Sequence, residues 1–139
     1  MKDAFPVIFT SLEDSKDTYL IEVPDLDIVT EGFGKADSIF MARDAIALAG
    51  MTLEDSGKNI PKASLITEIN LKKGQFIGQG KSYVSLVDVD FDEYRRKNEK
   101  KSVRRNVTLP AWLDYEAEKA GINVSRLLQE ALKQKLCIA

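Results

Sequence analysis

The hydrophobic pattern at the front of the chain predicts a small antiparallel sheet with one helix packed on it. Apolar residues run almost without a break over 5–9 and again over 19–23, which predicts two strands paired as a hairpin. Pro24 ends the second strand because proline has no amide hydrogen for a ladder, and a short third strand is expected at 28–32. From about Lys35 an apolar stripe recurs at helical spacing, formed by Ile39, Ala42, Ala45, Ile46 and Ala49.

Two further strands are expected after this helix, which Gly50 is predicted to end or weaken. The segments 65–71 and 83–89 alternate apolar and polar residues, as half-buried strands do. The glycine- and lysine-rich stretch between them is interpreted as a long hairpin connection. The predicted order is therefore β-β-β-α-β-β, an α+β fold with one helix on a face of the sheet.

The pattern over 103–139 is different and predicts a strand followed by two short helices. Val103–Leu109 reads as a strand, and Pro110 suits the first position of a helix. Gly121 ends that helix and Asn123 is a good N-cap for the next one. A lone strand cannot satisfy the hydrogen bonds of its backbone, and two short helices cannot bury so many leucines. We therefore expect an obligate homodimer in which two strands pair and four helices interlock. Its expected core consists of Val107, Leu109, Trp112, Leu127, Leu128 and Leu132.

Charge divides the chain at about the same place. The 139 residues carry a net charge of −2, but residues 1–92 hold 9 Lys+Arg and 16 Asp+Glu, whereas 93–139 hold 11 and 6. The segment 93–102 is almost wholly polar and is interpreted as a linker or a solvated helical extension. We therefore expect an acidic domain over 1–92 and a basic domain over 103–139. Only the basic domain is a candidate for binding nucleic acid.

Composition excludes several kinds of site. The chain has no histidine, which removes histidine-based triads, general bases and metal-ligand sets. The one cysteine, Cys137, cannot form an intramolecular disulfide, and neither a membrane-length apolar run nor a signal-peptide pattern is present. We therefore expect a cytoplasmic protein.

The carboxylates of the front domain could suggest a metal-dependent nuclease. Asp88, Asp90 and Asp92 alternate with apolar residues, so they are expected to share one strand face. Carboxylates from one strand seldom complete a coordination shell, and no ligand from another element is evident. A solvated strand end, or an acidic strip facing a basic partner, is the favoured interpretation. No metal, cofactor or catalytic site is expected, and Asp25 and Asp27 fit turn chemistry.

The order strand, Leu109-Pro110, helix, Gly121 turn, helix resembles a ribbon–helix–helix DNA-binding domain over 103–136. Side chains alternate between the two faces of a strand, so Val103, Val107 and Leu109 are expected to point inward and Arg104, Asn106 and Thr108 outward. The resemblance implies that the outward residues read bases in the major groove. Backbone amides at the start of the second helix can hold a phosphate, and here they belong to Asn123, Val124 and Ser125. The alternative is that the outward residues are only the solvated face of a dimerisation ribbon.

The front domain is similar to the HicB antitoxin family. The similarity rests on 5–9, 19–26, 30–32, 42–45 and Ile60-Pro61. It implies a partial ribonuclease-H-like domain that neutralises HicA, a small toxin that cleaves mRNA, and a protein that represses its own operon, in a higher-order complex with the toxin. The sequence departs from the family at Gly34 and at Asp27-Ile28, which concerns local stability. Acidic residues near the most similar segment are expected to contact the toxin: Glu22, Asp25, Asp27 and Glu31. A second candidate surface is the helix face with Lys35, Arg43 and Asp44.

Three functions remain open at this point. The first is an antitoxin that masks a HicA-like toxin and represses its own operon. The second is a stand-alone ribbon–helix–helix repressor whose front domain senses a ligand, which predicts a pocket with converging polar groups. The third is a metal-dependent nuclease, which predicts cleavage that depends on Asp88 or Asp90.

Overall fold

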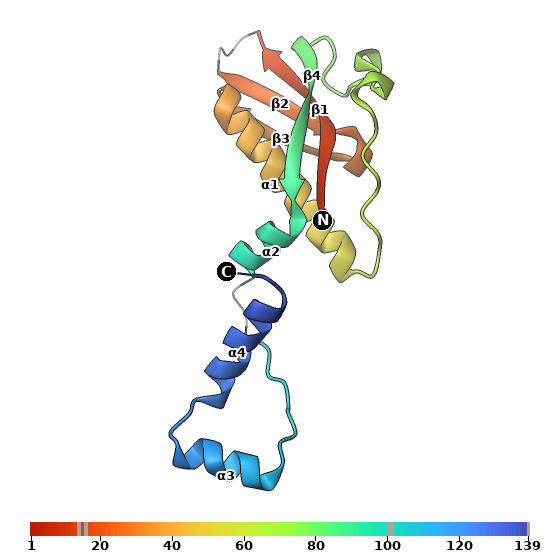
Figure 1. The fold of residues 1–139 in the computed structure, drawn as a ribbon. Helices are drawn as coiled ribbons and strands as arrows, with labels where there is room; N and C mark the ends of the chain where they lie inside the picture. Colours follow the sequence, from red (N-terminus) through yellow and green to blue (C-terminus); the bar gives the residue numbers. More distant parts are fainter. Residues whose placement is uncertain (14, 16, 100–101, 139) are drawn as a thin grey trace. The chain divides into compact units, whose positions relative to one another are not determined.

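The computed structural model describes residues 1–13, 15, 17–99 and 102–138. The chain forms two compact units, Met1–Lys100 and Lys101–Ala139. The fold is α+β, as predicted, with a four-stranded sheet in the first unit (Figure 1). None of the helices in the described part is long and apolar enough to cross a membrane.

The sheet is antiparallel throughout and has the order β3-β2-β1-β4. Its strands are β1 (Lys2–Leu12), β2 (Thr18–Val23), β3 (Ile28–Phe33) and β4 (Gly80–Asp90). All four were expected from the hydrophobic pattern, although β1 and β4 extend beyond the predicted bounds. The central strand β1 pairs with β2 on one side and along its whole length with β4 on the other (Figure 1).

The core lies between the sheet and the helix α1 (Lys35–Asp55). The odd-numbered residues Phe5, Val7 and Phe9 of β1 belong to this core, while Ile8 and Thr10 on the opposite face are also buried. The first strand is therefore buried on both faces, in agreement with its nearly unbroken apolar run. Fully burying side chains of this size contributes about 1.5–3 kcal/mol each to stability.

The helix α1 differs from its predicted form in two ways. Ala42 and Ile46 of the predicted stripe are buried, but Ile39 is 40% exposed because the buried face turns toward Ser38 and Ala47 instead. The helix also does not end at Gly50 but continues to Asp55. Packing explains why a glycine stands inside the helix. A side chain at Gly50 would enter the space that holds the ring of Phe91, a buried residue of the next helix.

The prediction of a strand at 65–71 is wrong. The segment forms two short 3-10 turns, η2 (Ile66–Glu68) and η3 (Leu71–Lys73), so the order is β-β-β-α-β. Local hydrogen bonds close these turns: the Glu68 carboxylate accepts from the Leu65 amide, and the Asn70 side chain accepts from the Lys72 amide. Such side-chain-to-backbone bonds compete with a sheet ladder.

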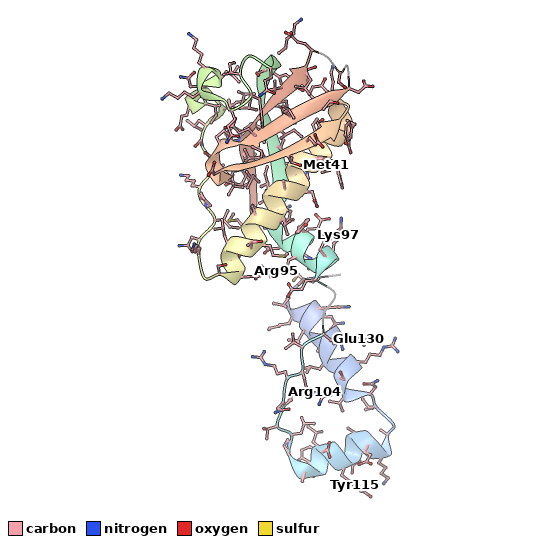
Figure 2. The ribbon with its side chains drawn as sticks, turned by 180° about the vertical axis from the view of Figure 1, so that it is seen from behind. Met41, Arg95, Lys97, Arg104, Tyr115 and Glu130 are labelled. Atoms are coloured by element: carbon pink, nitrogen blue, oxygen red, sulfur yellow. The ribbon has the colours of Figure 1, made fainter. Side chains whose placement is uncertain are left out.

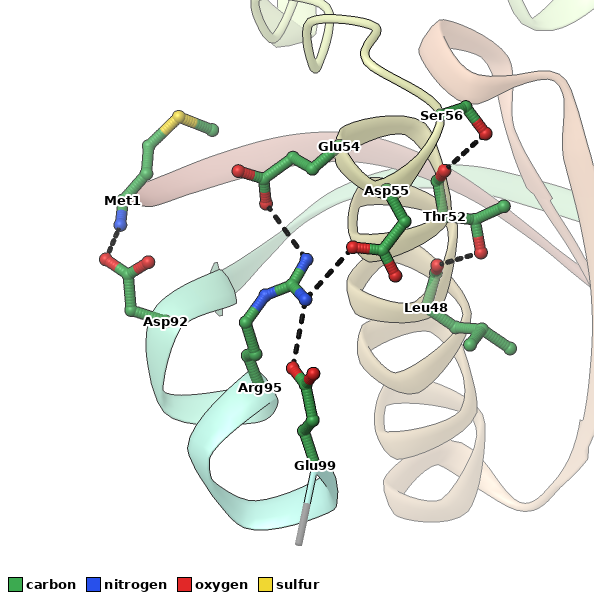
Figure 3. A network of polar contacts seen from close by, with 9 residues as sticks. All are labelled: Met1, Leu48, Thr52, Glu54, Asp55, Ser56, Asp92, Arg95 and Glu99. Carbon is green, nitrogen blue, oxygen red and sulfur yellow. Dashed lines mark hydrogen bonds and ion pairs between the residues drawn. The ribbon is translucent and has the colours of Figure 1, made fainter. Parts of the chain in front are cut away.

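The helix α2 (Phe91–Asn98) follows β4 directly. The segment 93–102 is thus a helical extension as far as Asn98, and its residues 100 and 101 lie outside the described part. Arg95 of α2 binds carboxylates of Asp55 at 3.1 Å, Glu54 at 3.8 Å and Glu99 at 3.0 Å (Figure 3). Glu54 and Asp55 stand at the C-terminal end of α1, where the helix dipole disfavours negative charge, and Arg95 offsets that effect.

The second unit contains the two predicted helices, α3 (Ala111–Lys119) and α4 (Val124–Lys135). Gly121 between them has a φ of 70°, which glycine adopts without strain. The predicted strand over 103–109 is not formed in the single chain, where 102–110 has no regular secondary structure. A strand needs a neighbour for its ladder hydrogen bonds, and the prediction placed that neighbour in a second chain.

Candidate functional site

The residues expected to read DNA bases lie on the segment that leads into α3. Arg104, Asn106 and Thr108 are all exposed. Figure 2 shows Arg104 on this segment, with Tyr115 on α3 and Glu130 on α4. The three side chains are therefore accessible to a ligand, and their alternation along the segment allows all three to share one face if the segment becomes extended.

The start of α4 has the predicted capping geometry. The Asn123 side chain accepts a hydrogen bond from the Arg126 amide at 3.1 Å, and the Asn123 carbonyl accepts from Leu127. The amides of Val124 and Ser125 belong to the first turn, where an α-helix offers no acceptor of its own. These amides can donate to an anion, whereas the Asn123 side chain is occupied by the cap.

The second unit buries almost none of its apolar surface. Of the described residues from 102 to 138, none is buried, and only Leu109 and Ala117 are half-buried. Apart from Leu109, the residues of the expected dimer core are exposed: Val107 by 54%, Trp112 by 68%, Leu127 by 53%, Leu132 by 52% and Leu128 by 39%. An apolar surface of this extent marks an interaction site, because water contact with it is unfavourable.

Two of the four acidic residues expected to contact a toxin hold the front unit together. The Asp25 carboxylate accepts from the Ser64 amide at 2.8 Å and from its hydroxyl at 2.6 Å. Glu22 accepts from the Gln75 amide at 2.9 Å. These bonds fasten the segment 64–79 to the sheet, where Gly74 lies against Ile8 on the face opposite α1.

The other two, Asp27 and Glu31, are exposed and accept no hydrogen bond from another described residue through their carboxylates. Asp27 has a φ of 51° and ends a 3-10 turn, η1 (Pro24–Leu26). Glu31 lies on the edge strand β3 and pairs with Leu20. The structure thus gives the four acidic residues two different environments: Glu22 and Asp25 are half-buried acceptors of internal hydrogen bonds, whereas Asp27 and Glu31 are exposed.

Each of the three alternating aspartates has a separate role. The Arg43 guanidinium binds Asp88 at 2.9 Å and holds the pKa of its carboxyl below the usual range. Asp90 caps α2 by accepting from the Glu93 amide. Asp92 does not continue the strand face as expected, because β4 ends at Asp90. It lies in α2, where the ammonium group of Met1 lowers its pKa (Figure 3). Within the described residues, no three His, Cys, Asp or Glu side chains lie close enough together to hold a metal ion.

A groove of about 350 Å³ lies between α1, α2 and the end of β4. Two of the cations that line it form ion pairs, Arg43 with Asp88 and Lys97 with Glu93 at 2.7 Å. Burial and Asp44 raise the pKa of Tyr94 beside it.

Sequence reasoning missed the contacts that link distant segments. Arg43 and Asp88 are 45 positions apart, so no local pattern identifies their pairing. Arg95 and Glu99 show the spacing of a helical ion pair, which was a readable signal. The pairing of Arg95 with α1 depends on tertiary structure and was not readable.

Comparisons with known proteins agree with these observations. A family model described as a HicB-like antitoxin of bacterial toxin–antitoxin systems matches residues 5–132. A toxin–antitoxin complex from Streptococcus pneumoniae has a similar chain, with 24% identity, a TM-score of 0.61 and coverage of 97% of this chain and 99% of that one. The antitoxin HicB of Burkholderia pseudomallei is also similar, with 24% identity, a TM-score of 0.50 and coverage of 96% of both chains. No curated protein matches the sequence. At such identities the two structures show a shared fold.

Proposed function

Because the chain belongs to the HicB-like family of antitoxins from bacterial toxin–antitoxin systems, we propose that it has two finer roles in the cytoplasm. Its front unit binds and masks a HicA-like ribonuclease toxin. Its back unit forms a ribbon–helix–helix homodimer that binds operator DNA and represses the operon of the pair. Masking needs no catalysis by this chain, because a protein that occupies the RNA-binding surface of the toxin excludes the substrate.

The exposed apolar surface of the back unit is the observation that carries the dimer proposal. Trp112 and the leucines of α4 cannot stay in water at these exposures without a large cost, since burying one such side chain stabilises by about 1.5–3 kcal/mol. A second copy supplies both the missing strand neighbour for 103–109 and an apolar layer for α3 and α4. Pairing two identical segments is an isologous contact, as in most homodimers.

The proposed DNA contacts follow from that dimer. Extended pairing turns Arg104, Asn106 and Thr108 to one face, where Arg can donate to guanine and Asn can pair with adenine. The amides of Val124 and Ser125 hold a backbone phosphate at the positive end of α4. The excess of basic residues in 93–139 favours binding to phosphates in general.

The proposed toxin contacts lie on the acidic front unit. A toxin that binds RNA presents a basic surface, and acidic side chains speed its capture and favour it over other partners. Asp27 and Glu31 are the exposed members of the proposed set, whereas Glu22 and Asp25 contribute through the segment 64–79 that they hold in place.

Co-purification tests the toxin proposal. The chain is expressed with its immediate genomic neighbour, only the neighbour is tagged, and the eluate is analysed by size exclusion. We expect a stable complex with a small basic protein that is toxic when expressed alone. Intact DNA binding without such a complex would contradict masking and favour the stand-alone repressor.

A gel-shift series with the operon's own promoter tests the DNA proposal. Arg104→Ala should weaken specific binding by about 1–3 kcal/mol, a factor of roughly 5–150, and relax base preference. Arg105→Ala is a matched control, because the neighbouring arginine is expected on the opposite face. Equal effects of both variants, confined to general affinity, would show that Arg104 contacts phosphate and does not read a base.

A further inference from the structure

The groove between α1, α2 and the end of β4 combines aromatic rings with carboxylates. Phe40 of α1 is 60% exposed and Tyr94 of α2 is half-buried, and both line the groove. Asp44 of α1 and Asp90 at the end of β4 also line it and are half-buried. A volume of about 350 Å³ is near the lower end of the range for ligand sites, which suits one long side chain inserted between the helices.

The charge around this groove is negative. A second hollow adjoins it and shares Val89, Asp90 and Glu93 with it. Together the two linings hold five carboxylates and three cations, which gives a net charge of −2. The carboxylates are those of Asp3, Asp44, Asp88, Asp90 and Glu93, and the cations are Lys2, Arg43 and Lys97.

The two cations of the groove itself are held by other carboxylates. Arg43 donates from Nε to the backbone carbonyl of Asp88 and from Nη2 to its carboxylate, both at 2.9 Å. Lys97 binds Glu93 at 2.7 Å. By contrast, none of the ion pairs formed among the described residues includes Asp44 or Asp90. These half-buried carboxylates are therefore the charges in the groove that a cation from a partner can balance.

We propose that the groove binds an arginine side chain of the toxin, an inference that rests on the masking role proposed above. A guanidinium is planar, so it can stack on an aromatic ring and donate to a carboxylate at the same time, which an ammonium group does less well. Proteins that bind RNA present arginines to its phosphates. An arginine held between Phe40, Tyr94 and Asp44 is withdrawn from the RNA, so the contact contributes to masking as well as to affinity.

Isothermal titration calorimetry tests the groove, with full-chain variants and the toxin released from the co-purified complex. Phe40→Ala should weaken binding by about 2–30-fold, as the loss of a cation–π contact does. Asp44→Asn should weaken it by at least about tenfold, because the amide has the same size but no charge. Phe33→Ala is the matched control, since Phe33 is 65% exposed but does not line the groove, and it should change binding by less than about twofold.

Chemical modification with phenylglyoxal, which reacts with arginine, identifies the bound side chain. One arginine of the toxin should be protected in the complex with the wild-type chain, as located by mass spectrometry. The same arginine should regain reactivity in the complexes with Phe40→Ala and with Asp44→Asn, but not in the complex with Phe33→Ala.

The outcomes separate this proposal from the one on which it rests. If the wild-type chain forms no complex with its neighbour, the masking role itself fails. If the wild type binds but Phe40→Ala and Asp44→Asn bind as tightly as Phe33→Ala, only the groove proposal is overturned. It is also overturned if both variants weaken binding while no arginine of the toxin changes its reactivity. Asp44→Asn preserves the size of the side chain, so it decides the matter if Phe40→Ala unfolds.

Discussion

Replacing Gly50 by alanine tests how tightly α1 and α2 are packed. An alanine Cβ at this position would lie 2.3 Å from Cε1 and 2.7 Å from Cδ1 of Phe91, and 3.1 Å from Ile60. Phe91 is only 4% exposed and packs edge-on against Phe5, with ring centroids 6.2 Å apart. The ring therefore has little room to withdraw.

Two opposing effects set the size of the change. Alanine in a helix interior is favoured over glycine by about 1 kcal/mol. Overpacking a filled core costs about 1–3 kcal/mol, and contacts well below 3 Å belong at the upper end of that range. The steric effect should win, so we expect Gly50→Ala to lower the free energy of unfolding by about 2 kcal/mol.

Urea unfolding followed by far-UV circular dichroism measures this change. The only tryptophan, Trp112, lies in the other unit, so its fluorescence transition should stay constant and serves as an internal control. Adding Phe91→Leu to Gly50→Ala should remove the clash, so the double variant should be about 3 kcal/mol more stable than the sum of the two single effects predicts. A Gly50→Ala protein as stable as the wild type, or more stable, would refute the packing argument.

Three other predictions concern polar contacts. Asp25→Asn should lower stability by about 1–3 kcal/mol and speed proteolysis within 64–79, because it weakens both bonds to Ser64; an unchanged cleavage pattern would contradict this role. Arg43→Met should return the pKa of Asp88 toward its usual value in an NMR titration. Because the ion pair lowers that pKa in the folded state, it stabilises the protein above the usual carboxyl pKa of about 3.9, and this contribution is lost in stronger acid. The free energy of unfolding of Arg43→Met should therefore fall less than that of the wild type when the pH is lowered through this range. Asn123→Ala should destabilise α4 by about 1 kcal/mol and speed amide exchange in its first turn, while Asn123→Asp keeps the cap.

The sequence predicted those parts of the fold that depend on local patterns. Four strands, the three main helices and the Asn123 cap all follow from alternation, helical spacing and capping chemistry. The error at 65–71 arose because its alternation resembles a strand, while Glu68 and Asn70 use their side chains to close turns. The helix does not end at Gly50 for a related reason: the role of this glycine depends on its packing against Phe91, which is distant in the sequence.

The candidate site was predicted unevenly. Sequence proximity suggested that Glu22, Asp25, Asp27 and Glu31 act together, but two of them are committed to internal hydrogen bonds. In the back unit the apolar pattern correctly indicated side chains that one chain cannot bury. Which protein or DNA surface meets them depends on a partner, and a single sequence does not encode the partner's shape.

The ion pairs of Arg95 bear on where the chain can be cut. The charge changes sign near residue 92, which invites a fragment that ends there. Such a fragment would keep β4 and α1 but lose α2, and it would leave Glu54 and Asp55 at the negative end of α1 without their cation. A fragment that reaches Asn98 retains this counter-ion together with Tyr94, which packs against the core. The first basic residues after the acidic segment thus serve the acidic unit itself, and a map of charge along the sequence does not coincide with the map of what folds together.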